Sequence, residues 1–161
     1  MIIIVLLGSN KTTTESEVLI LLNITDMALM NWTSALSVNI FEIDLQHQKL
    51  INILNKLHKA MKERRADLII ASTLDDLIGY TKMHFATEER YFRLYKYPHA
   101  EEHIAEHALF IAKIQEFTKK YKKGNVSISI DLMHYIADWI RDHIKGTDDK
   151  YTEFFHAKGL K

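Results

Sequence analysis

The chain has 161 residues, with 21 basic and 21 acidic side chains and no cysteine. This length predicts one domain that buries about two thirds of the surface exposed by its unfolded chain. The balanced charge creates no strong field that would attract nucleic acid or an anionic membrane. Without cysteine there are no disulfides, thiolate zinc sites or cysteine nucleophiles. Histidine is the unusual component, with nine residues.

The first 29 residues predict an extension whose role the sequence does not define. Two short apolar runs, MIIIVLL and VLILL, flank a polar stretch. Neither run has the length of a membrane-spanning helix, and the first lacks the basic region of a secretory signal. Met30 looks like a natural start, so the extension is either a misassigned start or an accessory tail, with a short surface helix or strand as the alternative. We expect the domain to occupy residues 30–161 of a cytoplasmic protein.

The rest of the chain predicts helices, because apolar side chains recur every three or four residues. The second helix is expected to stop before Pro98, the only proline of the chain. The third is expected to end at Gly124, where a left-handed cap costs little. The expected ranges are 45–64, 68–95, 99–122 and 128–145.

Short connections between helices of this kind specify an all-α fold. Each helix has one apolar face, and consecutive helices joined by short loops run in opposite directions. The sequence therefore predicts an antiparallel, up-down-up-down four-helix bundle with an N-terminal arm and a short C-terminal helix.

Six polar residues interrupt the apolar faces, and each helix contributes at least one of them. A buried polar group without a partner destabilises the fold, and a buried charge does so more strongly. Six such groups converging in one small bundle therefore indicate that something binds them. The six residues are His47, His84, Glu88, His103, His107 and His143.

The spacing of these residues indicates metal binding. His103 and His107 are four residues apart, as are His84 and Glu88. On a helix the members of such a pair share a face and are displaced by about 6 Å along the axis, so both reach one ion. Imidazoles and carboxylates without thiolate suit iron, with manganese, zinc or copper as competitors. Five imidazoles are too many for one ordinary site, so we expect two metal ions with bridging carboxylates.

A second bridging carboxylate is expected near the end of the fourth helix. His143 has no carboxylate four residues later, but Asp148 follows after five. If the helix ends at Gly146, the chain can turn back and direct Asp148 to the site. The remaining histidines fall outside the set and are interpreted as surface residues. They are His58, His99, His134 and His156.

Four segments carry these residues in a characteristic order. They are IDLQHQKL at 43–50, HFATEERYF at 84–92, YPHAEEHIAEHALF at 97–110 and WIRDHIKGTDDKY at 139–151. Together they resemble the successive motifs of the hemerythrin family in its bacterial form. The resemblance covers residues 31–155, with all seven ligand positions occupied, and it leaves the N-terminal extension without a counterpart.

The resemblance implies a non-haem di-iron centre that binds dioxygen reversibly. One iron would have filled coordination and the other an open position for dioxygen, with an oxo or hydroxo bridge between them. The filled iron would be held by His103, His107 and His143. The open iron would be held by His47 and His84. The bridging carboxylates would be Glu88 and Asp148.

Five apolar residues lie within one turn of these positions and are expected to form a dry pocket around the open iron. Ordinary core packing explains each of them equally well. They are Leu50, Phe85, Trp139, Ile140 and Ile144. Asp44 and Gln46 precede His47 and are able to orient a ligand imidazole, but exposed capping residues are the simpler interpretation.

Three other functions fit part of the pattern. HAEEH and HIAEH match the H-x-x-E-H motif of inverted zinc peptidases but leave three histidines unexplained. A ferritin-like di-iron oxidase uses Glu-x-x-His motifs, which only Glu153 and His156 match here. The same di-iron site also suits an oxygen or redox sensor, or a protein that binds iron or nitric oxide. We expect a monomeric dioxygen-binding protein rather than an enzyme, serving oxygen-requiring enzymes and binding neither nucleic acid nor membrane.

Overall fold

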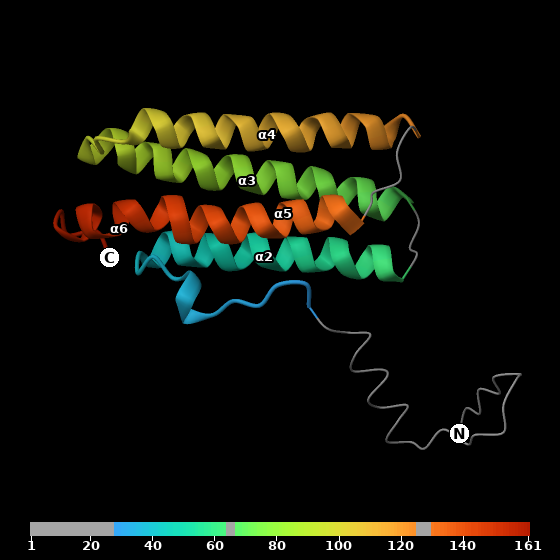
Figure 1. Cartoon of the computed structure of the whole chain (residues 1–161), viewed down its shortest axis with the longest axis horizontal. Helices are drawn as coiled ribbons and strands as arrows, with labels where there is room; N and C mark the ends of the chain where they lie inside the picture. The colour runs from blue at the N-terminus through green and yellow to red at the C-terminus, as the bar shows by residue number, and fades with distance from the viewer. Residues whose placement is uncertain (1–27, 64–66, 125–129) are drawn as a thin grey trace, which may run out of the picture.

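The computed structural model describes residues 28–63, 67–124 and 130–161. Four long helices lie side by side in it, and each runs opposite to the one before it in the chain (Figure 1). The predicted up-down-up-down four-helix bundle is therefore confirmed. The helices are α2 (Phe41–Lys62), α3 (Asp67–Tyr95), α4 (Ala100–Lys122) and α5 (Ile130–His143). Residues 1–27, most of the predicted extension, lie outside the described residues, so its role and the predicted domain limits stay predictions.

Two helix ends follow from local backbone chemistry. After α3, Lys96 adopts a left-handed conformation with φ 55°, and the Tyr97 amide donates to the Phe92 carbonyl at 3.0 Å. This hydrogen bond closes the helix, and Pro98 follows. After α4, Gly124 has φ 70°, and its amide donates to the Tyr121 carbonyl at 2.8 Å. The predicted ends before Pro98 and at Gly124 are confirmed.

The end of α5 differs from the prediction, because the chain does not break at Gly146. It widens into a π turn, Ile144–Asp148, and continues directly into α6, Asp149–His156. In a regular α-helix, five residues would place Asp148 about 140° around the axis from His143. The i to i+5 hydrogen bonding of a π turn instead brings residues five apart close to one face. The widened turn therefore directs Asp148 inwards without a break, and α6 is the predicted short C-terminal helix.

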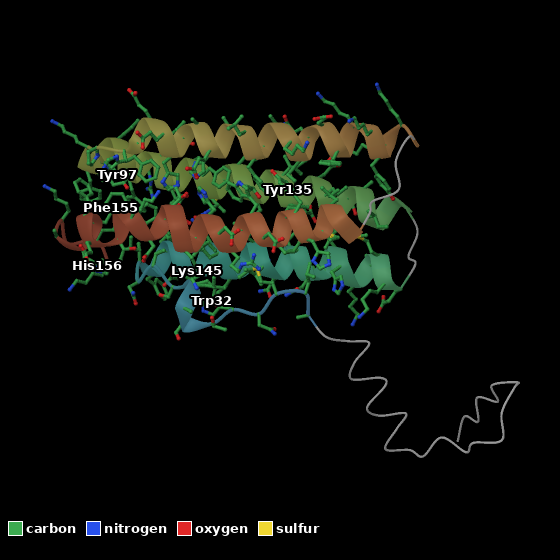
Figure 2. The ribbon with its side chains drawn as sticks, in the orientation of Figure 1. Trp32, Tyr97, Tyr135, Lys145, Phe155 and His156 are labelled. Atoms are coloured by element: carbon green, nitrogen blue, oxygen red, sulfur yellow. The ribbon has the colours of Figure 1, made fainter. Side chains whose placement is uncertain are left out.

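The N-terminal arm packs along α2 beside the core. Asn55 holds its start with two hydrogen bonds, accepting from the Met30 amide at 3.1 Å and donating to the Met30 carbonyl at 2.8 Å. Further along, Asp44 accepts from the Val38 amide at 2.9 Å. Between these contacts, the ring of Trp32, labelled in Figure 2, lies 6.4 Å from the ring of His47. Asp44 therefore ties the arm to the first turn of α2, but it is partly buried and does not cap the helix, so it is not the exposed capping residue that the sequence suggested.

The core is a continuous apolar cluster contributed by all the helices and the arm. Leu54, Leu57, Leu74, Leu77 and Ile136 have no exposed surface. Within the described ranges, no helix is long and apolar enough to cross a membrane.

Candidate metal centre

The bundle brings the seven predicted ligand residues together at one level of its core. Each is at most 5% exposed, so none of them is a surface group. They form two overlapping groups, and within each group one potential ligand atom per residue lies within 4.8 Å of the others. The first group is Glu88, His103, His107 and His143. The second group is His47, His84, Glu88 and Asp148.

The two carboxylates lie between the groups. Glu88 belongs to both. Asp148 belongs to the second, yet its Oδ1 is 3.1 Å from the Nε2 of His103 and 3.2 Å from the Nε2 of His143, in the first. Its Oδ2 is 3.2 Å from the Nε2 of His47. Each carboxylate therefore faces both sets of imidazoles, as a bridging group must.

The imidazoles of the first group point their Nε2 atoms at a common region. The Nε2 of His143 lies 3.1 Å from the Nε2 of His103 and 3.1 Å from that of His107. Two nitrogens bound at right angles to one ion, each about 2.1 Å from it, stand about 3 Å apart. The spacing therefore fits three imidazoles that share a metal ion.

Several buried polar atoms in the centre lack a hydrogen-bond partner among the described residues. They include both nitrogens of His47, both carboxylate oxygens of Asp148 and the Oε2 of Glu88. Buried polar atoms are otherwise almost always paired, because an unpaired one loses its hydration without compensation. Imidazole nitrogens and carboxylate oxygens left unpaired around one point form the donor set of a metal site, and the residues present fit iron.

The electrostatics of the centre favour the metal-binding protonation states of three ligands, whereas the facing carboxylates, with Asp148 first, raise the pKa of His143 above its ordinary value despite its burial. Burial lowers the pKa of His84 to about 4. Burial, followed by His103 and His143, lowers the pKa of His107 to about 3. Burial raises the pKa of Asp148, but the facing histidines, with His143 first, outweigh it and hold that pKa well below its usual value. At neutral pH, His84 and His107 are therefore neutral and Asp148 is ionised, ready to bind a cation.

Polar partners orient three of the imidazoles from outside. The Nδ1 of His84 lies 3.0 Å from the Oε1 of Gln46. The Nδ1 of His107 lies 3.3 Å from Glu89, and that of His143 lies 3.2 Å from Glu106. Amide and carboxylate oxygens only accept, so each Nδ1 carries the hydrogen and each Nε2 keeps its lone pair for the metal.

Two residues beside the centre, Gln46 and Tyr151, change the interpretation drawn from the sequence. Gln46 is only 8% exposed and also donates to Thr87 at 3.3 Å, so it orients His84 and is not an exposed capping residue. Tyr151, which the sequence analysis missed, is fully buried and donates from its hydroxyl to the Oε1 of Glu88 at 2.6 Å. Its position three residues after Asp148, on the same side of the following helix, was the available signal.

Among the predicted pocket residues, the two aromatic rings lie against imidazoles. Phe85 stacks on His107 with ring centroids 3.6 Å apart, and Trp139 stacks on His143 at 4.2 Å. Trp139 is partly exposed and lies beside the three-histidine group. Leu50, Ile140 and Ile144 are buried, as a dry pocket requires.

The residues that suggested other metal enzymes lie elsewhere or have other partners. His99 has a side chain that is 65% exposed, and Glu106 is occupied by His143, so neither H-x-x-E-H motif forms a peptidase site. His156 pairs with the Asn39 carbonyl at 2.9 Å, away from the centre. The predicted surface histidines are thus separate from the cluster: His134 is exposed like His99, and His58 and His156 are partly buried.

An all-helical bundle with a buried cluster of histidines and shared carboxylates defines a class of metal-binding proteins, and comparisons with known proteins give the family. Residues 38–155 match the family model described as "Hemerythrin HHE cation binding domain". The chain belongs to the hemerythrin family.

Individual relatives cover most of the chain. It is 34% identical over 127 residues to a bacteriohemerythrin of Methylococcus capsulatus, covering 78% of this chain and 95% of that protein. It is 32% identical over 120 residues to a myohemerythrin of Riftia pachyptila, covering 74% and 88%. A crystal structure of wild-type hemerythrin, 31% identical, matches with a TM-score of 0.74 over 78% of this chain and 97% of that one.

Proposed function

We propose that this chain holds two iron ions and binds dioxygen reversibly, for oxygen storage or for delivery to oxygen-requiring enzymes. The observation that carries the proposal is Glu88, whose carboxylate belongs to two groups of potential ligands at once. One shared carboxylate between two sets of imidazoles is what a pair of bridged ions needs, and membership of the hemerythrin family supports iron as the metal.

The assignment of ligands follows the two groups. His103, His107 and His143 would hold one iron, and His47 and His84 would hold the other. Glu88 and Asp148 would be shared between the two ions, together with an oxo or hydroxo group. Bound ferrous iron would supply the two electrons that reversible dioxygen binding requires.

The surrounding residues keep the ligands in place and the site dry. Gln46 fixes the tautomer of His84, which has Nε2 directed inwards. Tyr151 holds one oxygen of Glu88 and leaves the other, Oε2, 3.2 Å from the Nε2 of His107. The buried side chains of Leu50 and Ile144 exclude the water and protons that would turn reversible binding into net oxidation.

Binding rather than catalysis fits these residues best. In the described part of the chain, the charged partners of the centre are engaged in orienting imidazoles, and we assign none of them the role of a catalytic acid or base. Sensing and nitric oxide binding remain alternatives from the sequence, and no described residue favours them. A monomer in the cytoplasm also stays a prediction.

The test is an anaerobic titration of metal-free protein with ferrous iron, followed by visible spectra in oxygen and after oxygen removal. We expect two irons per chain and an absorption band that appears with oxygen and disappears without it. His134→Ala is a matched control, because this histidine is exposed and lies outside the cluster. Irreversible oxidation would contradict the binding function, and a preference for zinc would contradict iron.

A further inference from the structure

The candidate metal centre is sealed from solvent, since all seven ligand side chains are at most 5% exposed. An iron ion therefore has to pass through surrounding protein to reach them. Two surface hollows in the described part of the molecule approach the centre. The first, about 370 Å³, has His103 in its wall, and the second, about 400 Å³, has His143 in its wall.

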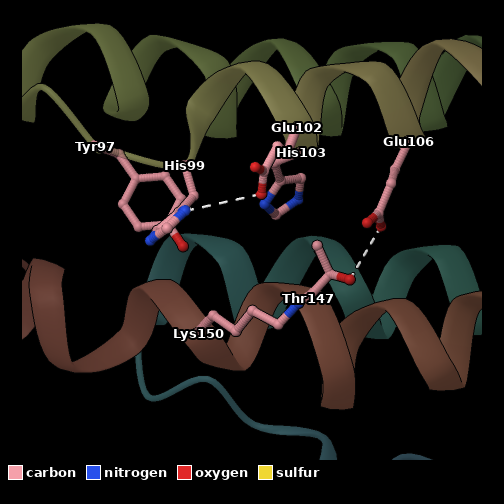
Figure 3. Close-up of a pocket in the computed structure, with 7 residues that line it drawn as sticks. All are labelled: Tyr97, His99, Glu102, His103, Glu106, Thr147 and Lys150. Carbon is pink, nitrogen blue, oxygen red and sulfur yellow. Dashed lines mark hydrogen bonds and ion pairs between the residues drawn. The ribbon is translucent and has the colours of Figure 1, made fainter.

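The first hollow offers groups that attract a metal cation at its mouth. Figure 3 shows Glu102 and His99 on one side, with the Nδ1 of His99 3.8 Å from the Oε2 of Glu102. The Glu102 side chain is 84% exposed and that of His99 is 65% exposed, so both meet solvent. Behind them stands His103, 2% exposed, with an Nδ1 that has no hydrogen-bond partner. Ligand groups thus continue from the solvent to the buried centre.

Two side chains, those of Glu106 and Thr147, stand between the two hollows. Glu106 lines both, and its Oε2 accepts from the Thr147 hydroxyl at 3.0 Å and lies 3.2 Å from the Nδ1 of His143. Thr147 belongs to the π turn, a conformation that is rare and occurs mostly as single turns inside α-helices. This hydrogen bond joins α4 to the π turn on the outer side of the three-histidine group, where the Glu106 side chain is 46% exposed.

We propose that the first hollow is the entrance through which ferrous iron reaches the di-iron centre. Glu102 and His99 bind the hydrated ion at the mouth, and the Glu106–Thr147 hydrogen bond is the barrier that opens to let it pass inwards. The ion exchanges water for protein ligands and its charge does not change. Lys150 lines the opposite side of the hollow (Figure 3), and its positive charge repels the ion. This proposal rests on the proposed function, because it requires the centre to bind iron.

The test is the rate at which metal-free protein takes up ferrous iron without oxygen. Stopped-flow tryptophan fluorescence reports arrival, because Trp139 stacks on His143 at 4.2 Å. We expect Glu102→Gln to slow uptake about threefold and Lys150→Gln to accelerate it by about the same factor, with both effects shrinking in high salt. Thr147→Val, which keeps the side-chain size and removes the hydroxyl, should accelerate uptake at every salt concentration.

Glu116→Gln is the matched control, because it removes the same charge from α4 about 20 Å further along the helix. It should leave the rate unchanged, and all these variants should still bind two irons. Equal rates for Glu102→Gln, Lys150→Gln and the wild type, with two irons bound, would overturn the entrance and leave the di-iron centre intact. Faster uptake in Trp32→Ala alone would also overturn it, because the arm would then be the barrier. Failure of the wild type to bind iron would overturn both proposals.

Discussion

The Tyr151 hydroxyl makes the one hydrogen bond that the described residues give to the Glu88 carboxylate, so Tyr151→Phe isolates its contribution. The two side chains are buried, at 0% and 1% exposed, and the oxygens are 2.6 Å apart. Phenylalanine keeps the ring, including its stacking on His103 with centroids 5.8 Å apart. The substitution therefore removes a hydrogen bond without opening a large cavity.

The magnitude follows from the burial of the acceptor. Removing the partner of a buried hydrogen-bond acceptor costs about 1–3 kcal/mol, because the acceptor stays out of water without a replacement bond. We expect Tyr151→Phe to lower the free energy of unfolding of the metal-free protein by about 2 kcal/mol. For a chain of this size, the melting temperature should fall by about 4–8 °C.

The assay is urea unfolding of the metal-free protein, followed by circular dichroism. The midpoint should shift while the denaturant slope stays the same. Tyr135→Phe is the control, because Tyr135 is 37% exposed, and it should change stability by less than about 0.5 kcal/mol. A midpoint for Tyr151→Phe equal to that of the wild type would refute the reasoning, because Glu88 would then not depend on this hydroxyl.

Four further predictions concern the centre. His103→Ala should lose both irons while staying helical, and iron analysis that still finds two per chain would contradict its assignment. Ile144→Asn should admit water and speed the decay of the oxygenated absorption band, and an unchanged decay rate would remove Ile144 from the pocket. Gln46→Leu should weaken iron binding about 10–100-fold in competition with a chelator, because the orienting acceptor is lost; equal affinity would show that Gln46 does not orient His84. In the metal-free protein, the pKa values of His84 and His107, about 4 and about 3, lie below the ordinary 6.5. Their neutral forms therefore contribute stability that is fully present above pH 6.5 and is lost as the pH falls, because the unfolded chain binds more protons; urea midpoints that rose on acidification would count against this.

Much of the centre could be predicted from spacing within single helices. The four-residue intervals between His84 and Glu88, and between His103 and His107, fix a shared face whatever the neighbouring helices do. The start of α2 was harder to predict. Its first residue is Phe41, 71% exposed, and Ile40 before it makes no side-chain cap, so neither periodicity nor capping marked the boundary.

Contacts between helices could not be predicted, because they depend on how each helix is rotated against its neighbours. Tyr151 reaches Glu88 across 63 residues of chain, and Gln46 reaches His84 across 38. The helix end predicted at Gly146 was wrong for a different reason. Glycine permits a left-handed helix end, but it also tolerates a widened turn, and here the wider turn satisfies the backbone while the chain stays helical.

The π turn sets which residues at the end of the chain face the centre. Glu88 shares a face with its histidine through an ordinary four-residue step, whereas Asp148 does so through one extra residue. That extra residue also determines how α6 is rotated about its axis. It therefore determines where Tyr151 points, and Tyr151 donates a hydrogen bond to Glu88. Deleting one residue from the turn would rotate α6 by about 100°. Both carboxylates would be affected together, Asp148 directly and Glu88 through the lost hydroxyl. The length of one turn thus controls two groups that lie on different helices.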